Sequence, residues 1–588
     1  MAETLISPGV FVSENDLSQI TQGPIAAGAA ILGPTVTGPV NKPTLVTSYS
    51  QYKAMFGAAF VSGGAPYEYL TSIAALNYFE QGGESLLVAR VASGSYTEAT
   101  ASIPSFLGAA NPSFVLETIT QGEVMNNNGQ VSATVNGALP SGSSANIRWE
   151  IVYSDSGSGT FSLIIRRGDD YQNNKTVLET WNNISLDPNQ NNFITYVIGD
   201  TKETPVLENG SYYMQITGSY PNKSNYIRVR SVDRPTPGYL NQYGQPYSQY
   251  TASLPAIGSG SYQGTFGAAT GKLWGCYDKA ALNLFENIRI NNSNVATDNT
   301  NIQGVFPTDY TVALSLLENG DAYDFNVVYA PGPNIQNAPS VITKVTSLAQ
   351  NRGDAIAVVD TTCYGQQIAT AVTNAQGYDN SYAATYWPWV QISSRETGKL
   401  NFVPASTLVP AVYEYNDKVS AEWFAPAGLN RGGMSTVLRP ERRLSVDNRN
   451  TLYQGKVNPI ATFPGVGTVI YGQKTLQSRA SALDRVNVRR LLISLKRFIR
   501  EIGETIVFEP NTQVTRNNFL NQVNPYLESV QQRQGLFSFQ VVMDETNNTP
   551  DVIDRNQLVG TIYLQPTRVA EFIQLDFNVL PTGTSFGG

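Results

Sequence analysis

The chain contains no histidine among its 588 residues. This absence excludes the Ser-His-Asp and Cys-His pairs of nucleophilic catalysis, histidine-ligated zinc or haem, and histidine pH switches. Cysteine is almost absent too: Cys276 and Cys363 are too few for a disulfide framework or a cysteine-built metal site. We therefore expect a β-rich protein of a reducing compartment without an obvious reaction to run, with no catalytic residue, no metal and no cofactor.

Charge and long apolar runs are also scarce. Charged residues make up 14% of the chain, and the net charge is 38 − 46 = −8 with a pI near 5.0, which argues against a nucleic-acid partner. No apolar run reaches 18 residues, so we expect no membrane insertion. Residues 1–4 lack the basic region of a secretory signal, and none is expected.

Bulky and turn-forming residues are plentiful instead. With 41% hydrophobic residues, 32 Tyr and 23 Phe, the chain has ample material for large cores, and 50 Gly and 32 Pro punctuate it. Its length suggests about four domains. Two incomplete phosphate loops, at residues 264–272 and 467–475, depart from the Walker pattern and are predicted to be ordinary loops.

Two stretches have the alternation of an α/β domain. In the first, strands over residues 24–49 precede a helix over 67–81 and a buried strand over 85–91. In the second, helices and strands alternate from residue 310 to residue 359. Such alternation predicts a parallel sheet with crossover helices.

The intervening residues 96–255 differ from these stretches in composition and in hydrophobic pattern. Asn, Gly and Ser clusters separate short segments in which apolar and polar residues alternate, which predicts antiparallel β-structure with exposed loops. The Gly/Ser-rich residues 258–261 are predicted to be a linker.

The clearest helix is predicted over residues 484–500, with apolar residues at helical spacing. Six cations are predicted on the sides away from that apolar stripe: Arg485, Arg489, Arg490, Lys496, Arg497 and Arg500. They form either an ordinary solvated face or a docking face for an acidic partner. Further strands are predicted over residues 537–543 and 559–564.

Both ends of the chain carry a lone β-prone segment. The N-terminal one centres on Val10, Phe11 and Val12, and the C-terminal one has an apolar face formed by Ile573, Leu575, Phe577 and Val579. Because an isolated strand leaves its backbone groups unpaired, the two segments must pair with each other or add to sheets of neighbouring copies.

Several blocks resemble the contractile tail sheath proteins of bacteriophages, particularly the T4-like type. They are residues 5–10 (LISPGV), 382–389 (YAATYWPW), 423–432, 484–491 (DRVNVRRL) and 548–556 (NTPDVIDRN). Residues 96–255 resemble nothing in that family, as expected of an outer insertion.

The resemblance implies an α+β multidomain fold. A sheath core built from both chain ends would carry a subtilisin-like, non-catalytic α/β middle domain, a β-rich outer insertion and extended terminal arms. The implied divisions are an N-terminal arm (1–22), a divided α/β domain (23–95 and 256–430), the insertion (96–255), a tube-facing C-terminal domain (431–569) and a C-terminal arm (570–588).

The resemblance also implies a function. Subunits would polymerise helically around a tail tube in an extended, metastable state and contract to drive the tube through the host envelope. The implied partners are other copies of the chain, the tail tube, the baseplate and the tail terminator. The implied location is the virion, after assembly in the host bacterial cytoplasm, and the helix over 484–500 would face the tube.

Three alternatives remain open at this level. The same sheath could serve a phage-derived injection device such as a tailocin. A non-contractile virion protein is disfavoured by the α/β middle and the basic helix. A hydrolase on the α/β domain lacks the histidine of the usual triad.

Overall fold

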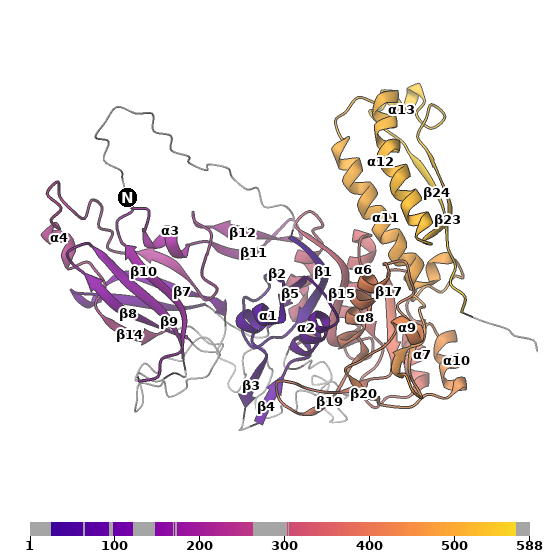
Figure 1. Cartoon of the computed structure of the whole chain (residues 1–588), viewed down its shortest axis with the longest axis horizontal. Helices are drawn as coiled ribbons and strands as arrows, with labels where there is room; N and C mark the ends of the chain where they lie inside the picture. Colours follow the sequence, from indigo (N-terminus) through magenta and orange to yellow (C-terminus); the bar gives the residue numbers. More distant parts are fainter. Residues whose placement is uncertain are drawn as a thin grey trace, which may run out of the picture.

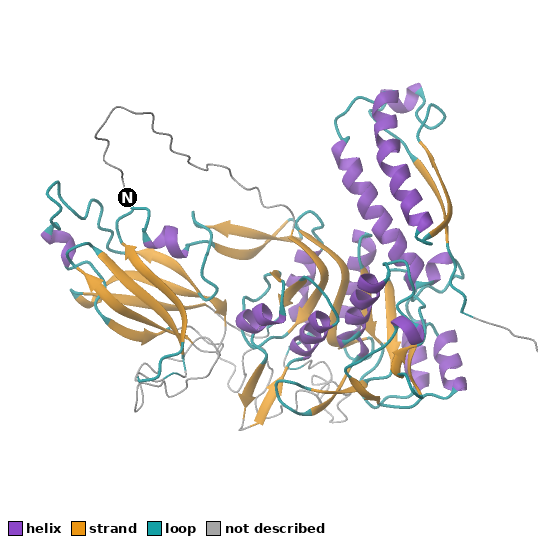
Figure 2. Cartoon of the chain, viewed as in Figure 1, coloured by secondary structure: helices purple, strands orange, loops and turns teal. Residues whose placement is uncertain are grey.

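The computed structural model describes residues 25–62, 65–92, 98–121, 147–168, 170, 173–262, 303 and 305–571. Three regions follow one another across the molecule: a β-rich region, a central α/β region and a helical region that rises from it (Figures 1 and 2). Among the described residues, no helix combines the length and apolar character needed to cross a bilayer.

An eight-stranded sheet forms the central region. Its order is β2 (Thr44–Val46), β5 (Leu86–Arg90), β1 (Ile25–Gly33), β15 (Tyr323–Asn334), β16 (Ile356–Asp360), β17 (Ala383–Trp387), β21 (Asn458–Phe463) and β22 (Gly467–Ile470). The inner strands are parallel, whereas β2 and β22 are antiparallel to their neighbours at the two ends. Strands from both α/β stretches of the sequence meet where β1 pairs with β15.

Helices cover both faces of this sheet. One apolar core lies under α5 (Tyr310–Leu317), α6 (Pro339–Arg352), α7 (Ile368–Gln376) and α10 (Val446–Gln454). The other lies under α1 (Tyr49–Phe56), α2 (Leu70–Glu80), α8 (Val409–Val419) and a small sheet of β18 (Val390–Ser393), β19 (Leu400–Val403) and β20 (Val437–Pro440). Because both faces are covered, strands such as β5 are buried at every residue.

Two glycines of β1 make room for side chains of α2. A Cβ on Gly28 would lie 2.3 Å from the hydroxyl oxygen of Tyr78, and a Cβ on Gly33 would lie 2.4 Å from the hydroxyl oxygen of Thr71. With a larger residue at either position, these buried side chains would have to move.

The β-rich region contains two packed antiparallel sheets. One has the order β13 (Ile227–Val232), β7 (Gly108–Gln121), β6 (Glu98–Ser105); the other has β10 (Val177–Ser185), β9 (Thr160–Arg167), β8 (Ile147–Asp155), β14 (Gly258–Ser261). Phe114 and Phe161 stack across the two sheets with ring centroids 5.4 Å apart. The predicted antiparallel β-structure is confirmed.

Smaller elements complete the central and β-rich regions. They are the hairpins β3 (Ala59–Ser62) with β4 (Ala65–Glu68) and β11 (Lys202–Glu208) with β12 (Ser211–Thr217), and the short helices α3 (Ile194–Ile198), α4 (Ser248–Thr251) and α9 (Gly428–Arg431).

The helical region consists of two long helices and a β-hairpin. They are α11 (Val486–Thr505), α12 (Gln513–Gln532), β23 (Leu536–Val542) and β24 (Thr561–Pro566), with the short helix α13 (Pro550–Asp554) between the strands. Phe498 of α11 stacks on Tyr526 of α12 at 3.7 Å between ring centroids. Trp423 and Ala421, which follow α8, join the same core and attach this region to the sheet.

Two sequence predictions need correction at this level. Residues 258–261 are not a linker, because they form β14 and pair with β8. Residues 467–475 are not purely a loop, because they begin with β22.

Candidate functional site: the seam around α11 and the root of the C-terminal arm

The basic helix α11 lies against the central region along a contact that we call the seam. The seam comprises the six cations of α11 and its N-cap together with their partners. The first turn of α11 is buried on all sides, from Val486 to Arg490. The first turn of this helix is buried against the central region and has no face in contact with solvent. Its polar side chains therefore need hydrogen-bond or ion-pair partners within the chain.

Arg490 occupies the deepest position in the seam. Its side chain is 3% exposed and forms a bidentate ion pair with Asp417 of α8, in which Nη1 lies 2.8 Å from Oδ1. The guanidinium also lies 4.8 Å from the ring centroid of Tyr413. Burial alone would lower the pKa of Arg490, but the charge and hydrogen bonds of Asp417 raise it above its ordinary value.

Glu414 lies one turn before Asp417 on α8 and has a perturbed pKa. Burial, with the nearby Asp417 carboxylate, raises the pKa of Glu414 to about 7, against the opposing effect of Arg490. Arg490 forms its ion pair with Asp417, and the Glu414 carboxyl holds its proton more tightly than it would in water.

Arg489 is also buried, with 4% of its surface exposed. Its guanidinium lies 3.9 Å from the ring centroid of Tyr382 and donates to the Ser381 hydroxyl at 2.5 Å. Lys496 donates to the Tyr382 hydroxyl at 3.0 Å from the next turns of the helix. The tyrosine thus contacts two cations of α11.

The distal part of the seam is shallower. Arg497 pairs with Asp324 at the start of β15, and their side chains are 24% and 30% exposed. Arg500 lies 3.6 Å from Asp354, and half of its side chain is exposed. These pairs sit near solvent, where ion pairs contribute little.

The structure therefore corrects the predicted basic face. Arg489 and Arg490 do not lie on a solvated side of α11, because the neighbouring domain covers them. The acidic partner surface lies, for much of this helix, within the same chain. The partners Asp417, Asp324 and Asp354 were missed because each lies more than 70 positions from its cation, so no local pattern reveals the pairing.

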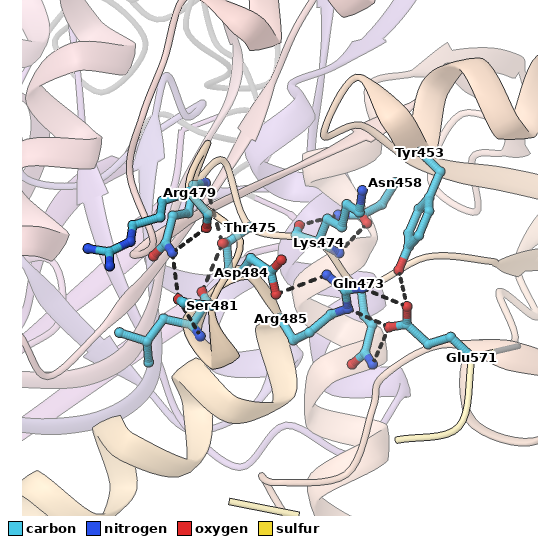
Figure 3. A network of polar contacts seen from close by, with 12 residues as sticks. Tyr453, Asn458, Gln473, Lys474, Thr475, Arg479, Ser481, Asp484, Arg485 and Glu571 are labelled. Atoms are coloured by element: carbon cyan, nitrogen blue, oxygen red, sulfur yellow. Dashed lines mark hydrogen bonds and ion pairs between the residues drawn. The ribbon is translucent and has the colours of Figure 1, made fainter. Parts of the chain in front are cut away.

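At the N-cap of α11, Arg485 takes part in a separate polar cluster (Figure 3). It binds Glu571, the last described residue, through Nε to Oε1 at 2.7 Å and Nη2 to Oε2 at 2.9 Å. Tyr453 of α10 donates its hydroxyl to Oε2 at 2.8 Å, and Gln473 donates its amide to Oε1 at 3.0 Å. We call these four residues the arm-root clamp.

Electrostatics in the clamp favour an ionised carboxylate. Burial alone would raise the pKa of Glu571, but the hydrogen bonds from Arg485, Tyr453 and Gln473 lower it below its ordinary value. Only 17% of the Glu571 side chain is exposed. No sequence signal marked Glu571, because its partners come from three distant segments.

The two predicted arm strands lie outside the described residues. This applies to Val10, Phe11 and Val12 and to Ile573, Leu575, Phe577 and Val579. Their pairing remains a prediction.

A buried pair of polar residues, Asp360 and Ser406, lies at the end of β16 and is relevant to the hydrolase alternative. Asp360 ends β16, is 3% exposed and accepts bonds from the backbone N–H of Ser406, at 3.0 Å, and from its hydroxyl. Burial raises the pKa of Asp360 to about 7, although both bonds from Ser406 lower it. The pair is sealed from solvent, and the sequence offers no histidine to activate the hydroxyl, so the arrangement ties a loop to the sheet.

Comparison with known protein families matches two adjoining segments. Residues 303–476 match the phage tail sheath protein central domain, and residues 478–579 match the phage tail sheath C-terminal domain.

Curated relatives carry the same description. The tail sheath protein of Vibrio phage KVP40 is 33% identical over 303 residues, which cover 47% of this chain and 45% of that protein. The tail sheath protein of Enterobacteria phage T4 is 32% identical over 286 residues, covering 46% and 43%. The matched segments thus span less than half the length of these relatives.

Solved structures of sheath proteins resemble the chain more loosely. The sheath of an extracellular contractile injection system in its contracted state is 28% identical, covers 43% of this chain and 71% of that one, and has a TM-score of 0.39. The sheath tail protein of Listeria innocua is 10% identical, covers 93% and 96%, and has a TM-score of 0.49.

Proposed function

We propose that the chain is the subunit of a contractile tail sheath, because residues 303–476 and 478–579 match the central and C-terminal domains of phage tail sheath proteins. Copies polymerise helically around a tail tube in an extended, metastable state. Contraction to a shorter, wider helix then drives the tube through the host envelope. The energy comes from the difference between two packings of the same subunits, as in other switching assemblies.

The observation that carries this proposal is the pair of free edges on the hairpin of β23 and β24. Among the described residues these two strands pair only with each other, while part of their apolar surface packs into the core of the helical region. The free edges of such a two-stranded sheet are templates for further strands. Apolar side chains also remain on its surface, since Phe537 is 75% and Tyr563 is 60% exposed.

We propose that the terminal arms of neighbouring copies add strands to this hairpin. The C-terminal arm offers alternate apolar residues, Ile573, Leu575, Phe577 and Val579, and the N-terminal arm offers Val10, Phe11 and Val12. Each added backbone hydrogen bond contributes about 1 kcal/mol net, so a few bonds per arm repeated through a lattice keep subunits linked while other contacts change.

Association with a tail tube, a baseplate and a tail terminator belongs to the same proposal. Within α11, Lys496 and Arg500 are the two exposed cations, and they would make the electrostatic contact with a tube. Arg489 and Arg490 are left out because they are buried against the central region. The curated relatives are all phage proteins, which favours a phage virion over an injection device as the setting.

Electron microscopy of the purified protein tests the proposal. The full chain, alone or with added tail tube, is expected to form hollow, striated cylinders. A variant that ends at Glu571 keeps the clamp but lacks the arm strand, and it is expected to stay a folded monomer. Normal cylinders from this truncation would contradict arm donation, and their absence from the full chain even with added tube would contradict the sheath function.

A further inference from the structure

The two arms leave the body of the subunit in different ways. The N-terminal arm leads directly into β1, which lies inside the eight-stranded sheet with β5 on one side and β15 on the other. The ladder with β15 begins at Ile25 and the ladder with β5 at Ala29, so hydrogen bonds of the sheet fix the root of this arm. The C-terminal arm follows β24, one strand of a two-stranded hairpin, and has no such support from the sheet.

The chain between the hairpin and the clamp is short and exposed. The N–H of Thr567 still bonds to the carbonyl oxygen of Gly535, at 3.2 Å. Residues 568–570 are all exposed. The next residue, Glu571, is then held by the clamp, whose other residues lie 86 to 118 positions away along the chain.

We propose that Glu571 anchors the C-terminal arm and sets the point from which the arm reaches its neighbour. This inference rests on the proposed function, in which the arm adds a strand to another copy. Four donors converge on one carboxylate, and the bidentate arginine contact fixes its direction as well as its position. Glu571 is a positioning residue for strand donation.

The anchor has a geometric consequence. With the clamp closed, the free arm begins after residue 571; with the clamp open, it begins after residue 567. Four further residues add up to about 14 Å of reach. Because the effective concentration of a tethered strand depends on tether length, a fixed root favours one acceptor hairpin in the lattice over its neighbours.

The clamp also links two regions of the subunit, the helical region and the central region. Arg485 begins α11, Tyr453 lies on α10, and Gln473 follows the edge strand β22, so the arm root touches both the helical and the central regions. A pull on the arm is therefore transmitted to both regions together rather than to the hairpin alone.

The test compares the full chain with E571A, E571Q and the control D324A. D324A removes the partner of Arg497, another ion pair between α11 and the central region, and leaves the clamp intact. The first readout is the rate of tryptic cleavage after Arg568, an exposed residue between the hairpin and the clamp, in the unassembled protein. The second is the regularity of the cylinders by electron microscopy.

E571A is expected to speed tryptic cleavage after Arg568 on the order of tenfold or more, because the chain on both sides of that residue is then free to adopt the extended form a protease needs, with the midpoint of urea unfolding nearly unchanged. E571Q is expected to have a smaller effect, since its amide oxygen still accepts a hydrogen bond. Cylinders of E571A are expected to show irregular striation spacing, whereas D324A behaves as the full chain in both readouts.

Two results separate this inference from the proposed function. An unchanged cleavage rate after Arg568 in E571A, with the full chain forming cylinders, would overturn the anchor and leave the sheath function standing. Faster cleavage in E571A, with no cylinders from the full chain on added tube, would support the anchor and overturn the sheath function. Regular cylinders from E571A would also overturn the positioning role.

Discussion

The two ends of the seam carry the same residue type but differ in their physics. Near the start of α11, Arg490 is sealed against Asp417, with Glu414 close by. Toward its end, Arg500 reaches Asp354 from a half-exposed position. If a buried cation loses its partner, water cannot solvate its charge in place of the partner. An exposed cation that loses its partner is solvated by water. Although arginines occur along the whole helix, the free-energy cost of removing one therefore falls from the start of α11 to its end.

The largest effect is expected from R490A. The substitution leaves the Asp417 carboxylate beside an apolar cavity, and breaking a mostly buried pair in this way costs about 3–5 kcal/mol. Urea unfolding of the unassembled protein measures the loss. The double variant R490A/D417A serves as the matched control, because removing both partners is expected to restore part of the stability. A loss below about 1 kcal/mol in R490A would abolish the contrast between the two parts.

A smaller, pH-dependent effect is expected from E414Q. The folded state raises the pKa of Glu414 from its ordinary 4.5 to about 7, so it binds the proton more tightly than the unfolded state does. The stability that protonation supplies is therefore complete below pH 4.5 and declines as the pH rises to about 7, by roughly 1–3 kcal/mol. A glutamine stays neutral and is expected to flatten that part of the curve.

Measuring the free energy of unfolding between pH 4 and pH 8 checks this expectation. D360N is a control outside the seam, since burial raises the pKa of Asp360 to a similar value. D360N should make the free energy of unfolding less dependent on pH, and it should leave the loss of stability caused by R490A unchanged. An unchanged slope in E414Q would show that the pKa of Glu414 is the same in the folded and unfolded protein.

The smallest effect is expected from R500A. Half of the arginine side chain is exposed and its nearest contact with Asp354 is 3.6 Å, so its loss should change the free energy of unfolding by no more than about 1 kcal/mol. The same urea titration provides the measurement. A loss comparable to that of R490A would show that depth in the seam does not govern the cost.

Much of the fold was predictable from periodicity. Apolar spacing correctly predicted α2, α6 and α11, and buried runs predicted β5, β15 and β16. The helix α12 was missed because it is rich in Asn and Gln and contains Pro525. β15 extends past Pro331 and Gly332, residue types that ordinarily end a strand, because the neighbouring strand β16 supports it.

The site was less predictable than the fold. A helical wheel places Arg489 and Arg490 away from the apolar stripe, but it carries no knowledge of a second domain that covers that side. The clamp depends on Tyr453, Gln473 and Arg485 meeting Glu571, and that meeting is a product of tertiary structure alone. The arm strands and the tube contact remain predictions.

The pairing of β1 with β15 also constrains how the protein is made. Ile25 lies opposite Tyr323 in that ladder, so the ribosome must add everything up to Tyr323 before the middle of the sheet can close. The β-rich region from Glu98 to Ser261 contains its own sheets and core and is complete well before that moment. During synthesis β1 and β5 therefore wait with exposed apolar faces, and their long-range closure is the step most open to aggregation in the crowded cell.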